Sequence, residues 1–165
     1  MSTEKKPMPA PRDLLVRASA RGPEEATRHP LNPRSEIHGW MLSRKTGLKR
    51  LGVNLLRIPP GKESFVPHVH YGEEEWMYVV SGSGVALVGG ETLEIGPGDF
   101  LGFPPATHAH HVRNTGREDL VYLAGGEILD VEVADFPEHG KRLVRTGAQG
   151  VVYALSLGEN PWGER

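Results

Sequence analysis

Short apolar runs, separated by turn residues, fill most of the chain after residue 36. These runs are rich in the β-branched and aromatic residues that favour strands, and their length is that of strands rather than helices. In the run that begins at Glu75, side chains would alternate between two faces, with Met77 and Val79 on one and Trp76 and Tyr78 on the other. The pattern predicts strands at Ile37–Leu42, Val53–Ile58, Glu75–Val80, Val85–Val88, Thr92–Ile95, Phe100–Phe103, Ala109–Arg113, Leu120–Ala124, Leu129–Ala134 and Val151–Leu155.

The segments between these runs have the chemistry of tight turns. Proline presets φ and glycine supplies positive φ, so each segment can reverse the chain between antiparallel strands. The separators are Pro59-Pro60-Gly61, Gly82-Ser83-Gly84, Gly89-Gly90, Gly96-Pro97-Gly98-Asp99, Pro104-Pro105 and Asn114-Thr115-Gly116. Roughly ten strands at this spacing protect their edges by closing into a barrel or a sandwich, so the sequence predicts an all-β fold.

The two ends of the chain are less regular. Residues 1–34 hold six of the 14 prolines and seven basic against four acidic residues, and their one strongly apolar stretch is Leu14-Leu15-Val16. We therefore expect an N-terminal arm at 1–34, a β-barrel at 35–136 and a C-terminal extension at 137–165 that packs on the barrel. The arm has room for a short helix around Asp13–Ser19.

Composition narrows the classes of function. A chain of 165 residues with a net charge of −2 has the size of one domain and no field that would attract nucleic acid. The absence of cysteine excludes disulfides, thiolate metal sites and cysteine nucleophiles. No stretch approaches the roughly 20 apolar residues that cross a bilayer, and Met1–Arg12 lacks a signal-peptide core, so we expect a cytoplasmic protein without membrane contact.

Five of the eight histidines fall in two short segments, one of which precedes an acidic run. Because residues i and i+2 of a strand point the same way, His68 and His70 are expected to share a face, and Glu75 can return to it after the bend at Tyr71-Gly72. By the same argument either His108 or His110 can supply a further ligand. Three histidines and one carboxylate suit one divalent ion such as Zn, Fe, Mn or Ni and leave coordination positions open for a ligand.

The chain resembles the cupin superfamily. Its first motif, G-x5-H-x-H-x3-4-E-x6-G, is reproduced from His68 through Glu75 to Gly82, and the end of its second motif, P-x-G-x2-H-x3-N, is reproduced from Pro105 through His110 to Asn114. The resemblance implies a double-stranded β-helix (jelly-roll) barrel with an N-terminal arm. It implies a metal site of His68, His70, Glu75 and His110, with His108 in the pocket as a candidate catalytic acid or base.

Some positions depart from the family pattern. Gly61 lies one residue further from His68 than the motif requires, and Gly98 lies one residue further from Pro105. Thr107 replaces a motif glycine. Since the family tolerates a gap of three residues before its carboxylate, Glu74 is an alternative to Glu75. Apart from this alternative, Glu73 and Glu74 are expected to form a solvated acidic turn, and His111 is expected at the surface or in an interface.

The resemblance covers several activities. A metal-dependent enzyme of the dioxygenase or the isomerase and lyase type, acting on a small oxygenated metabolite, is the leading hypothesis. The alternative is a non-enzymatic protein that binds or senses a sugar or an organic acid. Because Leu14-Leu15-Val16 cannot bury itself alone, and such arms commonly extend a partner's sheet in the family, we also expect a homodimer.

Overall fold

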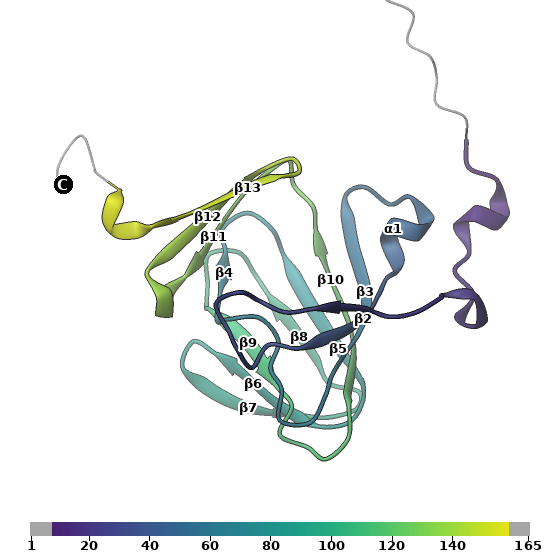
Figure 1. Cartoon of the computed structure of the whole chain (residues 1–165), viewed down its shortest axis with the longest axis horizontal. Helices are drawn as coiled ribbons and strands as arrows, with labels where there is room; N and C mark the ends of the chain where they lie inside the picture. The colour runs from purple at the N-terminus through teal and green to yellow at the C-terminus, as the bar shows by residue number, and fades with distance from the viewer. Residues whose placement is uncertain (1–7, 159–165) are drawn as a thin grey trace, which may run out of the picture.

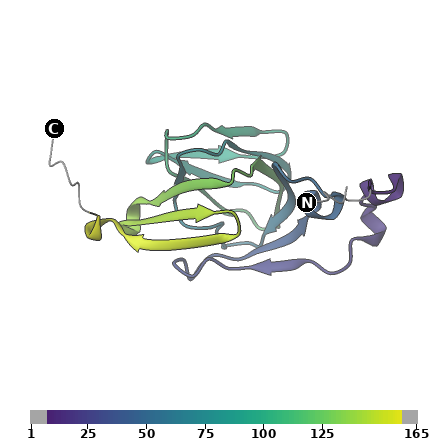
Figure 2. The same ribbon diagram turned by 90° about the horizontal axis from the view of Figure 1, so that it is seen from above.

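The computed structural model describes residues 8–158, which form an antiparallel β-barrel with a hairpin on one side and an extended arm on the other (Figure 1). The view in Figure 2 places the hairpin and the arm at opposite ends of the molecule. No helix in this part of the chain is long and apolar enough to cross a membrane. The expected all-β class and jelly-roll barrel are confirmed.

Two sheets form the barrel. The larger has the order β1 (Glu25–Thr27), β2 (Ile37–Met41), β3 (Leu51–Ile58), β10 (Leu120–Glu127), β5 (Glu75–Ser81) and β8 (Phe100–Phe103). The smaller has the order β7 (Glu91–Ile95), β6 (Gly84–Val88) and β9 (His110–Arg113). A one-turn helix, α1 (Leu42–Thr46), follows β2 and packs beside β3.

A third sheet lies at the side of the barrel (Figure 1). Its order is β13 (Gln149–Ala154), β12 (Lys141–Thr146), β11 (Val131–Phe136) and β4 (Val69–His70). Short 3₁₀ helices complete the described elements at Pro11–Leu14, Ala18–Ala20, Pro137–His139 and Leu155–Leu157. Because β4 follows His68 directly, this sheet carries part of the histidine cluster.

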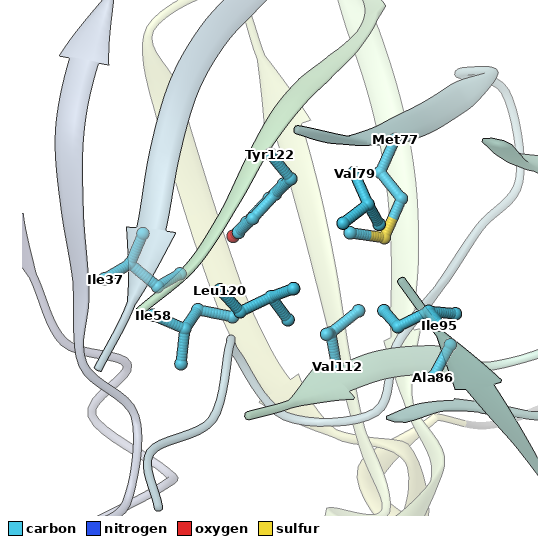
Figure 3. Close-up of a cluster of buried hydrophobic side chains, with 9 residues drawn as sticks. All are labelled: Ile37, Ile58, Met77, Val79, Ala86, Ile95, Val112, Leu120 and Tyr122. Atoms are coloured by element: carbon cyan, nitrogen blue, oxygen red, sulfur yellow. The ribbon is translucent and has the colours of Figure 1, made fainter. Parts of the chain in front are cut away.

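The barrel closes around one apolar core (Figure 3). Met77 and Val79 alternate with exposed Tyr78 and Val80 along β5, as expected for a strand with one buried face. The core residues come from both barrel sheets and comprise Ile37, Ile58, Met77, Val79, Ala86, Ile95, Val112, Leu120 and Tyr122. Burial of this apolar area is the main stabilising contribution to the barrel.

The glycine that closes the first motif has a steric role. Gly82 adopts φ of +78°, a region that side chains rarely enter. A Cβ atom at this position would also collide with the backbone carbonyl of Asp119. The turn between β5 and β6 therefore requires glycine for both conformation and close approach.

Several local elements differ from those expected. The prediction of a helix at Asp13–Ser19 is wrong. The arm instead forms two 3₁₀ helices, one on each side of residues 15–17. Strands β1 and β12 and helix α1 were not anticipated. The expected domain boundaries remain a prediction. Residues 25–27 of the expected arm pair with β2. Residues 1–7 and 159–165 lie outside the described part of the chain.

Candidate metal centre

Three imidazole rings converge on one oxygen of Glu75. The Nε2 atoms of His110, His70 and His68 lie 3.2, 3.4 and 3.6 Å from Glu75 Oε2. Ligand atoms of His68, His70 and Glu75 also lie within 4.8 Å of one another. Donor atoms about 2.0–2.2 Å from a shared ion lie roughly 3.0–3.5 Å apart, so the distances from the three rings to Glu75 are close to those of a coordination shell, although His110 is not in the group whose ligand atoms all lie within 4.8 Å of one another.

The backbone brings these residues together from three sheets. Glu75 begins β5, His70 ends β4 and His110 begins β9. An isolated β-bridge joins His68 to His110, with N–H to O distances of 3.3 Å and 2.9 Å. The two histidine segments, 40 residues apart in the sequence, are thereby fixed side by side.

The outer nitrogen of each ring faces a hydrogen-bond acceptor. Nδ1 of His68 lies 2.8 Å from the Val66 carbonyl, and Nδ1 of His110 lies 3.4 Å from the His108 carbonyl. Nδ1 of His70 lies 3.2 Å from Glu132 Oε1. Because these partners only accept, they favour a proton on Nδ1 and leave the Nε2 lone pairs directed at Glu75.

The ionisation of the cluster suits a cation. Burial is the largest cause that lowers the pKa of His110, which favours its neutral form. Burial alone would raise the pKa of Glu75, but the imidazole groups of His110, His68 and His70 around its carboxylate outweigh burial and hold that pKa well below its usual range. Phe103 stacks on the His110 ring with centroids 3.7 Å apart and fixes its plane.

Glu132 supports the cluster and was missed by the sequence reasoning. Its carboxylate is almost fully buried and accepts hydrogen bonds from the backbone N–H groups of Tyr71, Gly72 and Glu73 as well as facing His70 Nδ1. It therefore positions both the ring of His70 and the bend that leads to Glu75. The available signal was a charged residue between Val131 and Val133, on the same face of a predicted strand as apolar Ala134.

The acidic run before Trp76 is not a solvated turn throughout. Glu74 is exposed, whereas Glu73 is buried and binds the Arg145 guanidinium and the Leu129 backbone N–H. Of the three carboxylates, only that of Glu75 faces His68 and His110. The expected solvation of Glu73 is thus wrong because an arginine of β12 covers it.

His108 and His111 differ from their expected environments. His108 is exposed, is not among the residues that line the cavity beside the cluster, and has its ring against Gly89. The alternation argument fails there because the chain turns at Ala106, where φ is +55°, and β9 begins only at His110. His111 is buried rather than at the surface, and burial lowers its pKa.

A cavity of about 210 Å³ adjoins the cluster inside the barrel. His68, Glu75 and His110 contribute to its wall. The remaining lining comes mostly from β3, β5 and β10 and includes Ile37, Asn54, Leu56, Phe65, Trp76, Met77, Phe103, Tyr122, Ala124 and Glu127. An open, partly apolar space beside convergent polar groups is the usual form of a small-molecule site.

Comparisons with known proteins agree with this architecture. The model of the cupin domain family matches residues 54–126. A proposed sugar phosphate isomerase from Acidithiobacillus ferrooxidans has a similar structure, with a TM-score of 0.86 and 38% identity over 90% of this chain and 97% of that one. A predicted oxalate decarboxylase from Thermotoga maritima has a TM-score of 0.60 and 27% identity over 70% of this chain and 99% of that one.

Sequence relatives among curated proteins match a shorter region. An oxalate-binding protein from Thermotoga maritima is 38% identical over 69 residues, which is 42% of this chain and 55% of that protein. The chain thus spans about half the length of the curated relatives it matches. From the family match between β3 and β10, the two motifs and the similarity in structure, it follows that this chain belongs to the cupin superfamily.

Proposed function

We propose that His68, His70, Glu75 and His110 hold one divalent metal ion of the Zn, Fe, Mn or Ni type. The observation that carries the proposal is the approach of three Nε2 atoms to one carboxylate oxygen while each Nδ1 faces an acceptor. In that arrangement lone pairs would face a carboxylate, which is repulsive unless a cation or an added proton lies between them. Burial of His110 disfavours the proton.

The proposed activity is metal-dependent chemistry on a small oxygenated metabolite in the adjoining cavity. A bound divalent ion supplies Lewis acidity or, for a redox-active metal, a site for oxygen. The protein's own contribution is to fix the ligand rings through Glu132 and Phe103 and to enclose the metabolite between apolar walls. No step is assigned to His108, because its side chain lies outside this cavity.

A non-enzymatic role in binding a small organic acid is the second candidate. Apart from the proposed ligands, the titratable residues that line the cavity are His111, Tyr122 and Glu127. The similarity of this region to an oxalate-binding protein also favours it. Incubation of candidate metabolites with the metal-loaded protein separates the two roles, because an enzyme consumes its substrate and a binder returns it unchanged.

Elemental analysis of untagged protein tests the metal proposal. We expect about one equivalent of a transition metal per chain, and loss of most of it in His70→Ala and His110→Ala. His139→Ala is the matched control, because His139 is exposed in a 3₁₀ helix. Metal-free wild-type protein that also fails to take up Zn²⁺, Mn²⁺, Fe²⁺ or Ni²⁺ in dialysis would refute the proposal.

A further inference from the structure

Two polar side chains, Asn54 and Tyr122, lie among apolar residues on one part of the cavity wall, and Ser64, His111 and Glu127 also line the cavity. Asn54 lies on β3 and Tyr122 on β10, where Asn54 pairs with Ala124 and Leu56 pairs with Tyr122. Both polar residues therefore stand on the same face of the sheet, two positions apart. Their neighbours in the cavity include Leu56, Met77, Phe65 and Phe103.

Tyr122 presents a hydroxyl group that the protein does not use. Its ring points into the barrel interior and is only 5% exposed (Figure 3). Among residues 8–158 no side chain or carbonyl forms a hydrogen bond with this hydroxyl, and Asn54 likewise has no side-chain hydrogen bond. Burial, reinforced by the negative charge of Glu75, raises the pKa of Tyr122, so the hydroxyl remains a donor at neutral pH. The hydroxyl faces the cavity without a protein partner, so a ligand oxygen can accept its hydrogen bond in place of water.

The charge of the cavity limits what that ligand can be. Neither lysine nor arginine is among the residues that line it. A divalent ion together with the Glu75 carboxylate has a net charge of +1, and Glu127 at the wall adds negative charge. A monocarboxylate neutralises the charge of +1 on the ion and Glu75, whereas a phosphate ester with two negative charges would leave excess negative charge near Glu127, with no guanidinium or ammonium group to pair with it.

The volume of the cavity also favours a small ligand over a phosphorylated sugar. Small-molecule pockets commonly have volumes of about 300–1,000 Å³. At about 210 Å³ this cavity lies below that range. It therefore suits a compact molecule with a few carbon atoms better than a phosphorylated sugar.

We propose that the cavity takes a small monocarboxylate with a hydroxyl or keto oxygen on the neighbouring carbon and a short apolar chain, and that Tyr122 donates a hydrogen bond to it. The inference rests on the proposed function, because the carboxylate end is assigned to the metal centre. The apolar chain would contact Leu56, Phe65 and Met77. The proposal departs from the name of the Acidithiobacillus relative, since this cavity has no built phosphate site.

Titration calorimetry of Mn²⁺-loaded protein tests the inference with two probes of similar size. We expect 2-hydroxy-3-methylbutanoate to bind at least about tenfold more tightly than glycerol 3-phosphate. In Tyr122→Phe the affinity for the hydroxy acid should fall about 5- to 30-fold, while the affinity for Mn²⁺ changes less than about twofold. Tyr153→Phe is the matched control, because Tyr153 lies on β13 and lines a different cavity, and it should leave both affinities unchanged.

The outcomes separate this inference from the function on which it rests. Failure of the wild-type protein to bind Mn²⁺ or any other transition metal overturns the proposed function and the inference with it. Metal binding with equal or tighter binding of glycerol 3-phosphate overturns only the inference. The same conclusion follows if the hydroxy acid does not bind, or if Tyr122→Phe binds it as tightly as the wild type.

Discussion

The barrel and the four-stranded sheet beside it are built by different interactions. In the barrel, Val79 and Leu120 are completely buried. In the β12–β13 hairpin, by contrast, Val151 is 64% exposed and Val152 is 50% exposed, although they are neighbours on one strand and point to opposite faces. The position of this hairpin at the side of the barrel in Figure 1 agrees with its exposure.

Charged contacts tie the outer sheet to the bend before Glu75. Arg145 of β12 binds Glu73, and Arg142 binds Asp135, which also accepts a hydrogen bond from Tyr71. Glu132 holds the same bend from β11. The proposed metal centre lies where the two regions meet, so we expect apolar truncations to act on the stability of the barrel and polar ones to act on the metal site.

The largest effect is expected from Leu120→Ala in the barrel core. Because Leu120 is completely buried, the substitution removes packing and leaves a cavity, and the free energy of unfolding should fall by about 2–5 kcal/mol. Urea unfolding followed by tryptophan fluorescence measures it. Val151→Ala is the matched truncation in the hairpin and should cost less than about 0.5 kcal/mol. Equal losses in the two variants would remove the distinction between the regions.

A smaller effect is expected from Glu132→Gln, and it should appear in metal binding. The amide keeps the size of the side chain but removes the charge that faces His70 Nδ1 and accepts three backbone N–H groups. The dissociation constant for Mn²⁺ or Zn²⁺, measured by competition with a chelating dye, should rise about 10- to 100-fold. Glu94→Gln, at an exposed position of β7, should leave it unchanged. Unchanged affinity in folded Glu132→Gln would show that Glu132 does not position His70.

The same division explains what the sequence could predict. The strand Phe100–Phe103 was predicted with its observed bounds, and the barrel strands near it with small errors at their ends, because one buried face imposes alternation. Strand β12 was missed because Lys141, Arg142 and Arg145 interrupt its apolar pattern. Those arginines pair with Asp135 and Glu73, contacts that follow only from the tertiary arrangement.

The candidate site was predictable to a similar extent. Motif spacing selected His68, His70, Glu75 and His110, and the structure brings all four together. Their role as metal ligands stays a prediction. Spacing carries no information on Glu132, whose position beside His70 depends on the pairing of β11 with β4.

A third, smaller effect is expected from Asp135→Asn and should depend on pH. Hydrogen bonds from Arg142 are the largest cause that lowers the pKa of Asp135, and Tyr71 adds to them while burial opposes both. A carboxyl with a lowered pKa stabilises the folded state above its ordinary pKa of 3.8, and that stabilisation is lost as pH falls through the folded value. The variant should be about 1–2 kcal/mol less stable than the wild type at pH 7, and the difference should shrink below pH of about 3.8.

Urea unfolding at several pH values measures this difference in stability, with exposed Asp130→Asn as the control. A difference that does not change with pH would mean that the Arg142 pair does not stabilise this sheet.

The smallest effect on the free energy of unfolding is expected from substitutions in the arm. Its exposed apolar residues are expected to contact a second subunit and to contribute little to the stability of the fold. Leu14 and Leu15 are 54% and 55% exposed, whereas the arm is held to the barrel further on, by Trp40 Nε1 donating to the Gly22 carbonyl and by Arg57 pairing with Glu24. A Leu14→Ser, Leu15→Ser double variant should therefore change the free energy of unfolding of a monomer by less than about 0.5 kcal/mol. If the predicted homodimer forms through this segment, light scattering should give the mass of a dimer for the wild type and of a monomer for the variant, with Leu93→Ser as an exposed control on β7. An unchanged mass would show that these leucines do not contribute to the dimer interface.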